Sequence, residues 1–158
     1  MSSWSRLVRF NPASNPSQIL IGEPVDSSLD VGLASFNKLP ISINVYSGSS
    51  ILSAGSPLPG RVEEVAQLLS PLAEGEVGSI RCIGLNYTKH AVECKLPIPE
   101  VPILFLKPSS SLTGPWPAKI VVPKFTVADD TADYESEMTI VRFSLFIERS
   151  LLTIYRTK

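Results

Sequence analysis

The feature that most constrains this chain is its proline content. Fourteen of the 158 residues are proline, and all of them lie between Pro12 and Pro123. A proline inside a helix costs about 3 kcal/mol, because its ring clashes with the preceding turn and it has no N–H to donate. Long helical bundles and coiled coils are therefore excluded over that range. We expect a mainly β fold with few short helices.

Composition narrows the class of protein further. The chain is 44% hydrophobic and 18% charged with a net charge of −1, which excludes a disordered polyelectrolyte and lacks the basic stripe of a nucleic-acid binder. No apolar run approaches the roughly 18 residues of a membrane span.

Cys82 and Cys94 predict free thiols in a reducing compartment, and so a cytoplasmic protein. Arg6 and Arg9, which precede the first acidic residue, keep mitochondrial import open as an alternative.

The N-terminal part of the sequence predicts a small β-rich domain over residues 1–78. Residues 4–10 and 19–25 are strand-like, and the Asn, Pro and Ser residues at 11–18 between them are typical of a turn, so we expect a β-hairpin. Residues 41–51 predict a further strand.

One segment of that domain predicts a helix. Over residues 61–69 the apolar side chains recur at helical spacing, and Ser70-Pro71 would end the helix. Glu63 and Glu64 suit its first turn. The apolar stripe consists of Val62, Val65, Ala66 and Leu69.

A second group of elements follows residue 78. Residues 80–84 predict a strand that runs into a turn. Residues 87–95 predict two helical turns, with Asn86 as the N-cap and Pro97 as the end. The apolar run at 103–106 lies between two prolines, and its length favours a buried strand over a helix. Further strands are expected at the positions 120–122 and 134–141.

Two carboxylates in the last of these strands form a candidate metal site. Residues two apart share a face of a strand, so Glu135 and Glu137 project together, roughly 7 Å apart. Oxygen ligands suit a hard cation such as Mg²⁺, Mn²⁺ or Ca²⁺. A solvated strand edge is the alternative interpretation. Three more carboxylates lie close by in sequence, namely Asp129, Asp130 and Asp133.

The single histidine forms a second candidate site. His90 and Glu93 are three residues apart on one helical face, an arrangement that orients an imidazole for general-base activation of water. Cys94 lies four residues after His90, which leaves open a Cys–His nucleophile pair or a partial zinc site of His90, Glu93 and Cys94. A surface helix with an ordinary side-chain contact is the fourth possibility.

A third polar group follows the predicted buried strand. Lys107 and the serines at 109–111 come directly after the apolar run, where a cation and hydroxyls can bind a carboxylate or carbonyl. A polar turn that closes the strand explains the same residues equally well.

In order, three of these motifs resemble the fumarylacetoacetate hydrolase family. They are IGLNYTKHAVE at residues 83–93, PILFLKPS at 102–109 and DYESE at 133–137. The similarity is closest to the smaller acylpyruvate hydrolase and oxaloacetate decarboxylase type, and it extends to residues 4–10 and 22–24 of the leading domain.

The resemblance implies a β-roll that binds one divalent cation, Mg²⁺ or else Mn²⁺ or Ca²⁺. It implies that Glu135 and Glu137 are metal ligands and that His90 and Glu93 activate water. The motif residues Tyr87, Lys107 and Ser109 would lie beside a small 2-oxo acid or dicarbonyl substrate, and Leu85 stands where relatives carry a basic residue.

The expected reaction is cleavage of a C–C bond in an acylpyruvate or a related 1,3-dicarbonyl acid. The cation would stabilise the enolate that is released, while water attacks the other carbonyl. An oxaloacetate decarboxylase or tautomerase of the same family is the alternative. The resemblance also implies a homodimer if the fold is complete, with no nucleic-acid or membrane partner.

The likeness to the family ends at Val141. Relatives continue with a Gly-rich turn, a third metal carboxylate about thirty residues on and a lysine. Residues 142–158 instead carry a net charge of +3 and look like an unrelated or aberrant tail. We therefore expect an incomplete catalytic domain over residues 79–141, with weakened metal binding. A truncated, non-catalytic binding module is the competing expectation.

Overall fold

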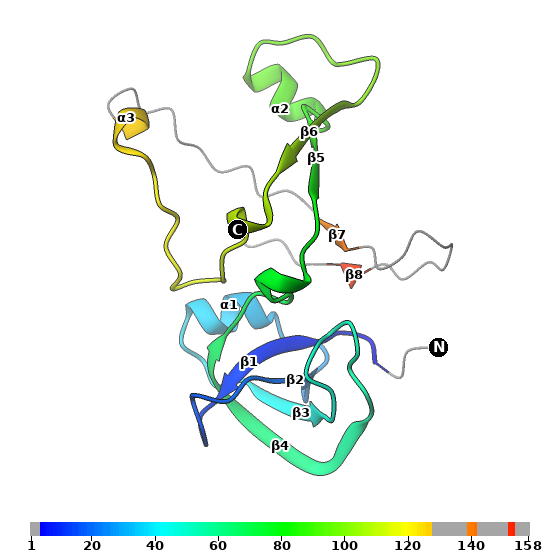
Figure 1. The fold of residues 1–158 in the computed structure, drawn as a ribbon, viewed down its shortest axis with the longest axis vertical. Coiled ribbons are helices and arrows are strands. Elements are labelled where there is room, and N and C mark those ends of the chain that lie inside the picture. The colour runs from blue at the N-terminus through cyan, green and yellow to red at the C-terminus, as the bar shows by residue number, and fades with distance from the viewer. Residues whose placement is uncertain (1–3, 128–138, 142–151, 154–158) are drawn as a thin grey trace. The chain divides into compact units, whose positions relative to one another are not determined.

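The computed structural model describes residues 4–127, 139–141 and 152–153. The chain divides into two compact units: Leu72–Leu112 forms one, and Met1–Pro71 with Thr113–Lys158 forms the other. Helices are short throughout the described part, where none exceeds six residues. The expected mainly β fold with few short helices is therefore confirmed (Figure 1).

Four antiparallel strands close into a barrel in the first unit (Figure 1). They are β1 (Val8–Pro12), β2 (Leu20–Pro24), β3 (Ser42–Tyr46) and β4 (Pro57–Leu68). The pairing of β1 with β2 confirms the predicted hairpin, and β3 confirms the strand expected within 41–51.

The helix predicted for residues 61–69 is wrong, because this segment is the end of strand β4. One part of β4 pairs with β3, placing Glu63 opposite Ile43, and a later part pairs with β1, placing Leu68 opposite Phe10. A helix of nine residues is marginal by itself in water. Pairing along both edges satisfies the same backbone groups and closes the sheet. Gly60, with φ of +73°, adopts in β4 a left-handed conformation that costs other residues energy.

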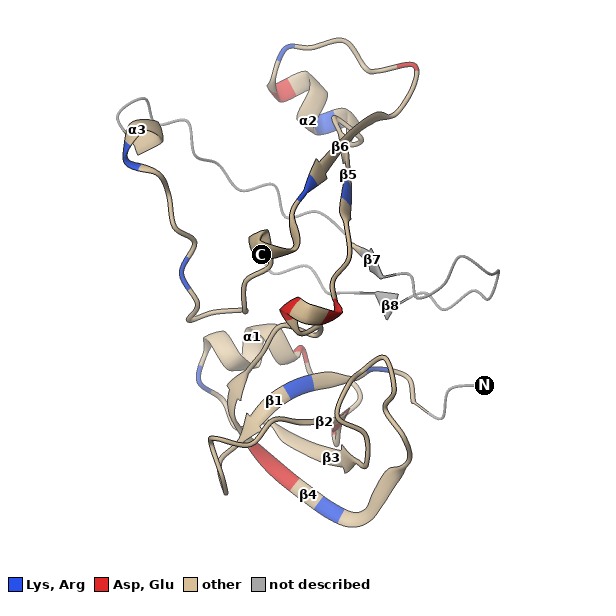
Figure 2. Cartoon of the chain, in the orientation of Figure 1, with Lys and Arg blue, Asp and Glu red and all other residues tan. Residues whose placement is uncertain are grey.

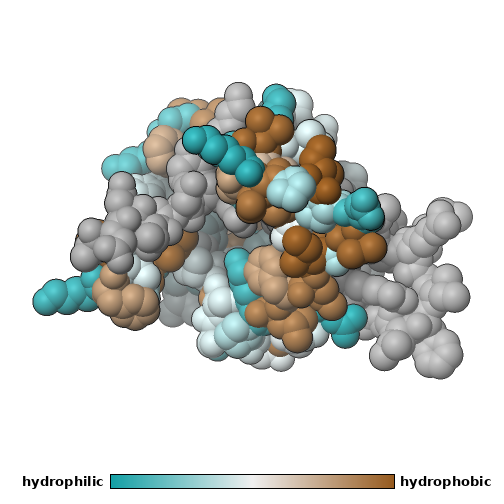
Figure 3. Space-filling view, turned by 90° about the horizontal axis from the view of Figure 1, so that it is seen from above, coloured by the Kyte–Doolittle hydropathy of each residue, from teal (hydrophilic) through white to brown (hydrophobic). Residues whose placement is uncertain are grey.

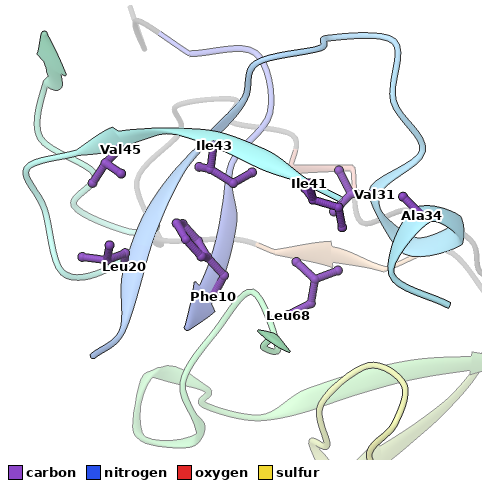
Figure 4. Close-up of a cluster of buried hydrophobic side chains, with 8 residues drawn as sticks. All are labelled: Phe10, Leu20, Val31, Ala34, Ile41, Ile43, Val45 and Leu68. Atoms are coloured by element: carbon purple, nitrogen blue, oxygen red, sulfur yellow. The ribbon is translucent and has the colours of Figure 1, made fainter. Parts of the chain in front are cut away.

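Side chains from all four strands and one helix fill the barrel core (Figure 4). The helix α1 (Val31–Phe36) begins at Asp30, whose side chain accepts a hydrogen bond of 2.9 Å from the Leu33 N–H. This N-cap satisfies one of the open donors of the first turn. The core residues are Phe10, Leu20, Val31, Ala34, Ile41, Ile43, Val45 and Leu68.

Glu23 on β2 ties the start of the chain to the barrel. Its Oε1 accepts hydrogen bonds from the Ser5 N–H at 2.8 Å and the Ser5 hydroxyl at 2.7 Å, and a longer one from the Arg6 N–H. The Tyr46 hydroxyl donates to Oε2 at 3.2 Å. Partial burial raises the pKa of Glu23, but these hydrogen bonds outweigh it and hold the pKa below the ordinary value of 4.5.

The second unit is built on an antiparallel ribbon of two strands. These are β5 (Ile80–Gly84) and β6 (Ile103–Lys107), and both confirm strands expected from the sequence. The expectation that β6 is buried is wrong, because Leu104 and Leu106 are 61% and 64% exposed. The ladder holds two strands in the described part of the chain, and β5 is mostly half-buried whereas β6 is exposed along its length. Figure 3 shows that apolar residues, in brown, lie on the face of the molecule seen from above.

A short helix, α2 (Thr88–Glu93), connects to the end of β5. It begins one residue later than expected, since Tyr87 rather than Asn86 is the N-cap and its side chain makes no capping hydrogen bond. The helix also stops before Pro97. Lys95 has φ of +56°, and the N–H groups of Lys95 and Leu96 bond back into the last turn, as in a Schellman motif.

The described structure also contains the 3-10 helices η1 (Glu74–Glu76) and η2 (Ser109–Ser111) and three further short elements. They are α3 (Lys124–Val127) and the paired strands β7 (Ile140–Val141) and β8 (Leu152–Thr153). The strand predicted for residues 120–122 is wrong: the segment is irregular and Val121 is 89% exposed, because no described strand lies beside it to pair. Most of the strand expected over 134–141 lies outside the described residues. Among the helices that are described, none is long and apolar enough to cross a membrane.

Candidate active site

The helix α2 and its C-cap carry three side chains that can take part in chemistry, namely His90, Glu93 and Cys94. It follows β5 after a sharp turn at Leu85, whose φ of +51° lies in the left-handed region. A side chain other than glycine rarely adopts this conformation, and such residues are often found at functional sites. The sequence holds no signal for it, because leucine is not a residue that favours positive φ.

The pair expected from sequence, His90 and Glu93, is brought together. The Nδ1 of His90 lies 3.8 Å from Oε2 of Glu93, while the side chains are 30% and 79% exposed. The spacing of three residues on one helix produces this approach. The separation is that of an ion-pair contact and is longer than a hydrogen bond.

The same ring nitrogen has a second neighbour. Cys94 Sγ lies 3.8 Å from His90 Nδ1, so the contact that a Cys–His pair requires is present. The zinc alternative is not supported, because the described residues include no group of three or more His, Cys, Asp or Glu that could hold a metal ion. Both cysteines of the chain are free thiols, as expected.

Two of the predicted binding residues, Lys107 and Ser109, lie at the opposite end of the ribbon from α2. Lys107 pairs with Ile80, whereas the helix follows Gly84, which pairs with Ile103. Five paired residues separate the two ends by about 13 Å. Strand register thus keeps Lys107 away from the turn that leads into α2.

The predicted binding residues are exposed or half-buried. Lys107 Nζ lies 5.8 Å from the centre of the Phe105 ring. Ser109 begins the short 3-10 helix Ser109–Ser111, and Tyr87 is 43% exposed at the start of α2. Lys107 and Arg81 are the charged residues of the ribbon (Figure 2). Arg81 pairs with Leu106 and Lys107 with Ile80, so the two cations lie on opposite faces of the ribbon and do not form one anion site.

The expected metal ligands Glu135 and Glu137 lie outside the described residues. Their side-chain chemistry can still be compared with the ligands that a divalent cation prefers. Both offer carboxylate oxygens, the ligand type that Mg²⁺ and other hard divalent cations take. The donor set therefore fits such an ion.

Comparisons with known proteins relate this site to a family. Residues 79–142 match the family described as fumarylacetoacetate (FAA) hydrolase C-terminal. A caffeoylpyruvate hydrolase from Neonothopanus nambi is 40% identical over 146 residues, which is 89% of this chain and 49% of that protein. An oxaloacetate tautomerase from Xenopus laevis, named as mitochondrial, is 30% identical over 144 residues, or 86% of this chain and 43% of the relative.

The matching region includes the whole of the candidate site on α2. The chain spans about half the length of these two relatives. A 2,4-didehydro-3-deoxy-L-rhamnonate hydrolase from a Sphingomonas strain is 42% identical over 87 residues, 49% of this chain and 28% of that protein. No solved structure matches. The resemblance seen in the three motifs is confirmed: residues 79–142, which hold all three, match the fumarylacetoacetate hydrolase family.

Proposed function

We propose that this chain carries the water-activating residues of a divalent-metal-dependent hydrolase that cleaves a C–C bond in acylpyruvates. The observation that carries the proposal is the pairing of His90 with Glu93 at 3.8 Å on α2. The substrate class is supported by the 40% identity to a caffeoylpyruvate hydrolase along most of the chain.

The pair can perform the two proton transfers that this hydrolysis needs. With Nδ1–H held toward Glu93, Nε2 of His90 accepts a proton from water, whose oxygen attacks the acyl carbonyl. The bond between that carbon and the methylene of the pyruvate part then breaks. Its electron pair passes to the methylene carbon, which takes the proton back from His90. The products are a carboxylic acid and pyruvate.

The remaining predicted residues take supporting roles. Glu135 and Glu137 would hold the divalent cation, which when bound would stabilise negative charge on the 2-oxo acid part of the substrate. The ammonium of Lys107 and the hydroxyls of Ser109 and Tyr87 would bind the carboxylate or carbonyl oxygens of the same ligand. We also propose a cytoplasmic homodimer, with a mitochondrial location as the alternative.

A second candidate function is oxaloacetate tautomerisation, with decarboxylation as a related possibility. The 30% identity to an oxaloacetate tautomerase along 86% of the chain favours it. The same two residues would suffice, because His90 could take a proton from C3 of the keto acid and return it to the enol. This reaction changes neither the mass nor the number of molecules.

Product analysis separates these candidates. The chain is incubated with an aromatic acylpyruvate or with oxaloacetate, each with Mg²⁺, and pyruvate, carbon dioxide and the enol form are measured. A hydrolase releases pyruvate and the acid from the acylpyruvate. A tautomerase equilibrates enol and keto oxaloacetate without releasing pyruvate. Turnover of neither substrate would contradict both and support the binding module.

Variants test the residue roles. His90→Gln is expected to lower turnover by about 10²-fold or more, the range for loss of a general base. Lys89→Ala, an exposed neighbour on α2, is the matched control and should leave turnover unchanged. Glu135→Ala combined with Glu137→Ala should abolish any Mg²⁺-dependent stabilisation and turnover. Unchanged turnover in His90→Gln would refute the proposed mechanism.

A further inference from the structure

The Nδ1 atom of His90 has two side-chain neighbours, Glu93 and Cys94. His90 Nδ1 lies 3.8 Å from Glu93 Oε2 and equally 3.8 Å from Cys94 Sγ. Nδ1 can carry one hydrogen, so its proton cannot serve both neighbours at once. The state of the Cys94 sulfur therefore bears directly on how His90 pairs with Glu93.

The backbone fixes Cys94 in this position. Cys94 is the C-cap of α2, and its N–H donates to the His90 carbonyl at 3.0 Å. The left-handed Lys95 then turns the chain away, with the Leu96 N–H bonded to the Ala91 carbonyl at 3.0 Å. The thiol is thus held one helical turn after the imidazole.

The two cysteines of the chain differ in access and surroundings. Cys94 is exposed, whereas Cys82 is half-buried on β5 opposite Phe105. Cys94 also has a basic imidazole within contact distance and is followed by Lys95. An exposed thiol is open to reaction with small disulfides, because thiol–disulfide exchange depends on access to the sulfur.

We propose that Cys94 is a site of reversible modification by low-molecular-weight disulfides and that the modification uncouples His90 from Glu93. The Cys94 thiol loses its proton to His90 or to water, and the sulfur attacks one sulfur of the disulfide. The S–S bond of the reagent breaks, and its other half leaves and takes up a proton as a free thiol. Cys94 is oxidised to a mixed disulfide and the leaving half is reduced.

The adduct changes the site by its size and by the loss of the thiol hydrogen. A bulky group on Sγ occupies the side of the imidazole where Nδ1 faces Glu93, so the orienting contact is lost. The expected effect on turnover rests on the proposed function. The chemical modification and its effect on the ring do not, so the experiment measures those two directly.

The labelling test uses glutathione disulfide as the probe, with intact mass and peptide mapping as the readout. One glutathione adduct is expected on the wild type and on Cys82→Ser, and none on Cys94→Ser. With 5,5′-dithiobis(2-nitrobenzoic acid), Cys94 should react about tenfold faster than Cys82, and His90→Gln should slow Cys94. Preferential labelling of Cys82, or equal rates at both thiols, would overturn the proposal.

The uncoupling test relies on the fact that His90 is the one histidine of the chain. Its ring ¹⁵N signals can be followed without assignment, before and after treatment with glutathione disulfide. The Nδ1 signal should shift on treatment of the wild type, return with dithiothreitol and stay unchanged in treated Cys94→Ser. An adduct at Cys94 that leaves this signal in place would refute the uncoupling. Loss of turnover without an Nδ1 shift would also contradict it.

Discussion

The barrel and the β5–β6 ribbon use similar apolar strands with opposite results. Ile43 and Val45 of β3 are fully buried, because the barrel closes around them. Phe105 of β6 is 39% exposed and its neighbours on that strand are more exposed still. A strand sequence alone therefore does not decide burial; the number of strands that share its sheet does.

The reactive residues lie on the unit that buries less. His90, Glu93 and Cys94 belong to a helix next to the open ribbon, and Ala91 is its one buried residue. Two-stranded ribbons are marginally stable in water, and regions with few buried apolar contacts open at low free-energy cost. Most of the buried core of the described chain lies in the barrel, whereas the candidate site lies on α2 beside the ribbon.

The largest expected effect is a loss of stability on mutating the barrel core, compared with the same mutation on the ribbon. Phe10→Ala empties the centre of the barrel core, where the ring is fully buried, and should lower the free energy of unfolding by about 3–5 kcal/mol. Phe105→Ala on the ribbon is the matched change and should cost less than about 1 kcal/mol, because much of that ring already contacts water. Urea unfolding followed by circular dichroism measures both. Equal losses in the two variants would break the comparison.

A second change tests how tightly the barrel is closed. A Cβ at Gly22 would clash with the Asn44 carbonyl oxygen and with the Ile43 side chain. Gly22→Ala should therefore destabilise the barrel by about 1–3 kcal/mol, the usual cost of overpacking. Gly75→Ala is the control, since nothing lies within 4 Å of the added methyl group. A thermal midpoint of Gly22→Ala equal to that of Gly75→Ala would show that the strands separate easily.

The smallest expected effect concerns pH. The pKa of Glu23 is lower in the folded barrel than the ordinary value of 4.5, so the unfolded chain binds its proton first as the pH falls. The stabilisation is complete above about pH 4.5 and is lost as the pH drops through the folded pKa. Glu23→Gln should cost about 1 kcal/mol at pH 7 and less at pH 3. The exposed Glu100→Gln is the control, and a pH-independent loss in Glu23→Gln would contradict the assignment.

The correct predictions came from turn residues, prolines and spacings between residues that are close together in the sequence. The turn residues between 11 and 18 predicted the hairpin of β1 and β2, and prolines bracketed the strand β6. The contact of His90 with Glu93 followed from helical spacing alone. Each of these features depends on residues that are close in the chain, where spacing and turn chemistry contain the information.

The predictions that were wrong concern segments whose structure depends on residues far away in the sequence. Strand β4 has apolar residues at helical spacing, yet its pairing with β1 and β3 decides its conformation. The exposure of β6 depends on how many strands join its ladder, and the segment 120–122 lacks a described partner. The metal pair Glu135 and Glu137 remains a prediction, because it lies outside the described residues.

The closure of the barrel also sets an order of events during protein synthesis. Phe10 on the first strand faces Leu68 on the last, so the sheet cannot close until the ribosome has released nearly all of the first 70 residues. Until then the nascent β1–β3 segment has an open edge that can pair with another chain. A chaperone that shields this edge during translation would raise the yield of folded protein, whereas faster refolding of the finished chain would not.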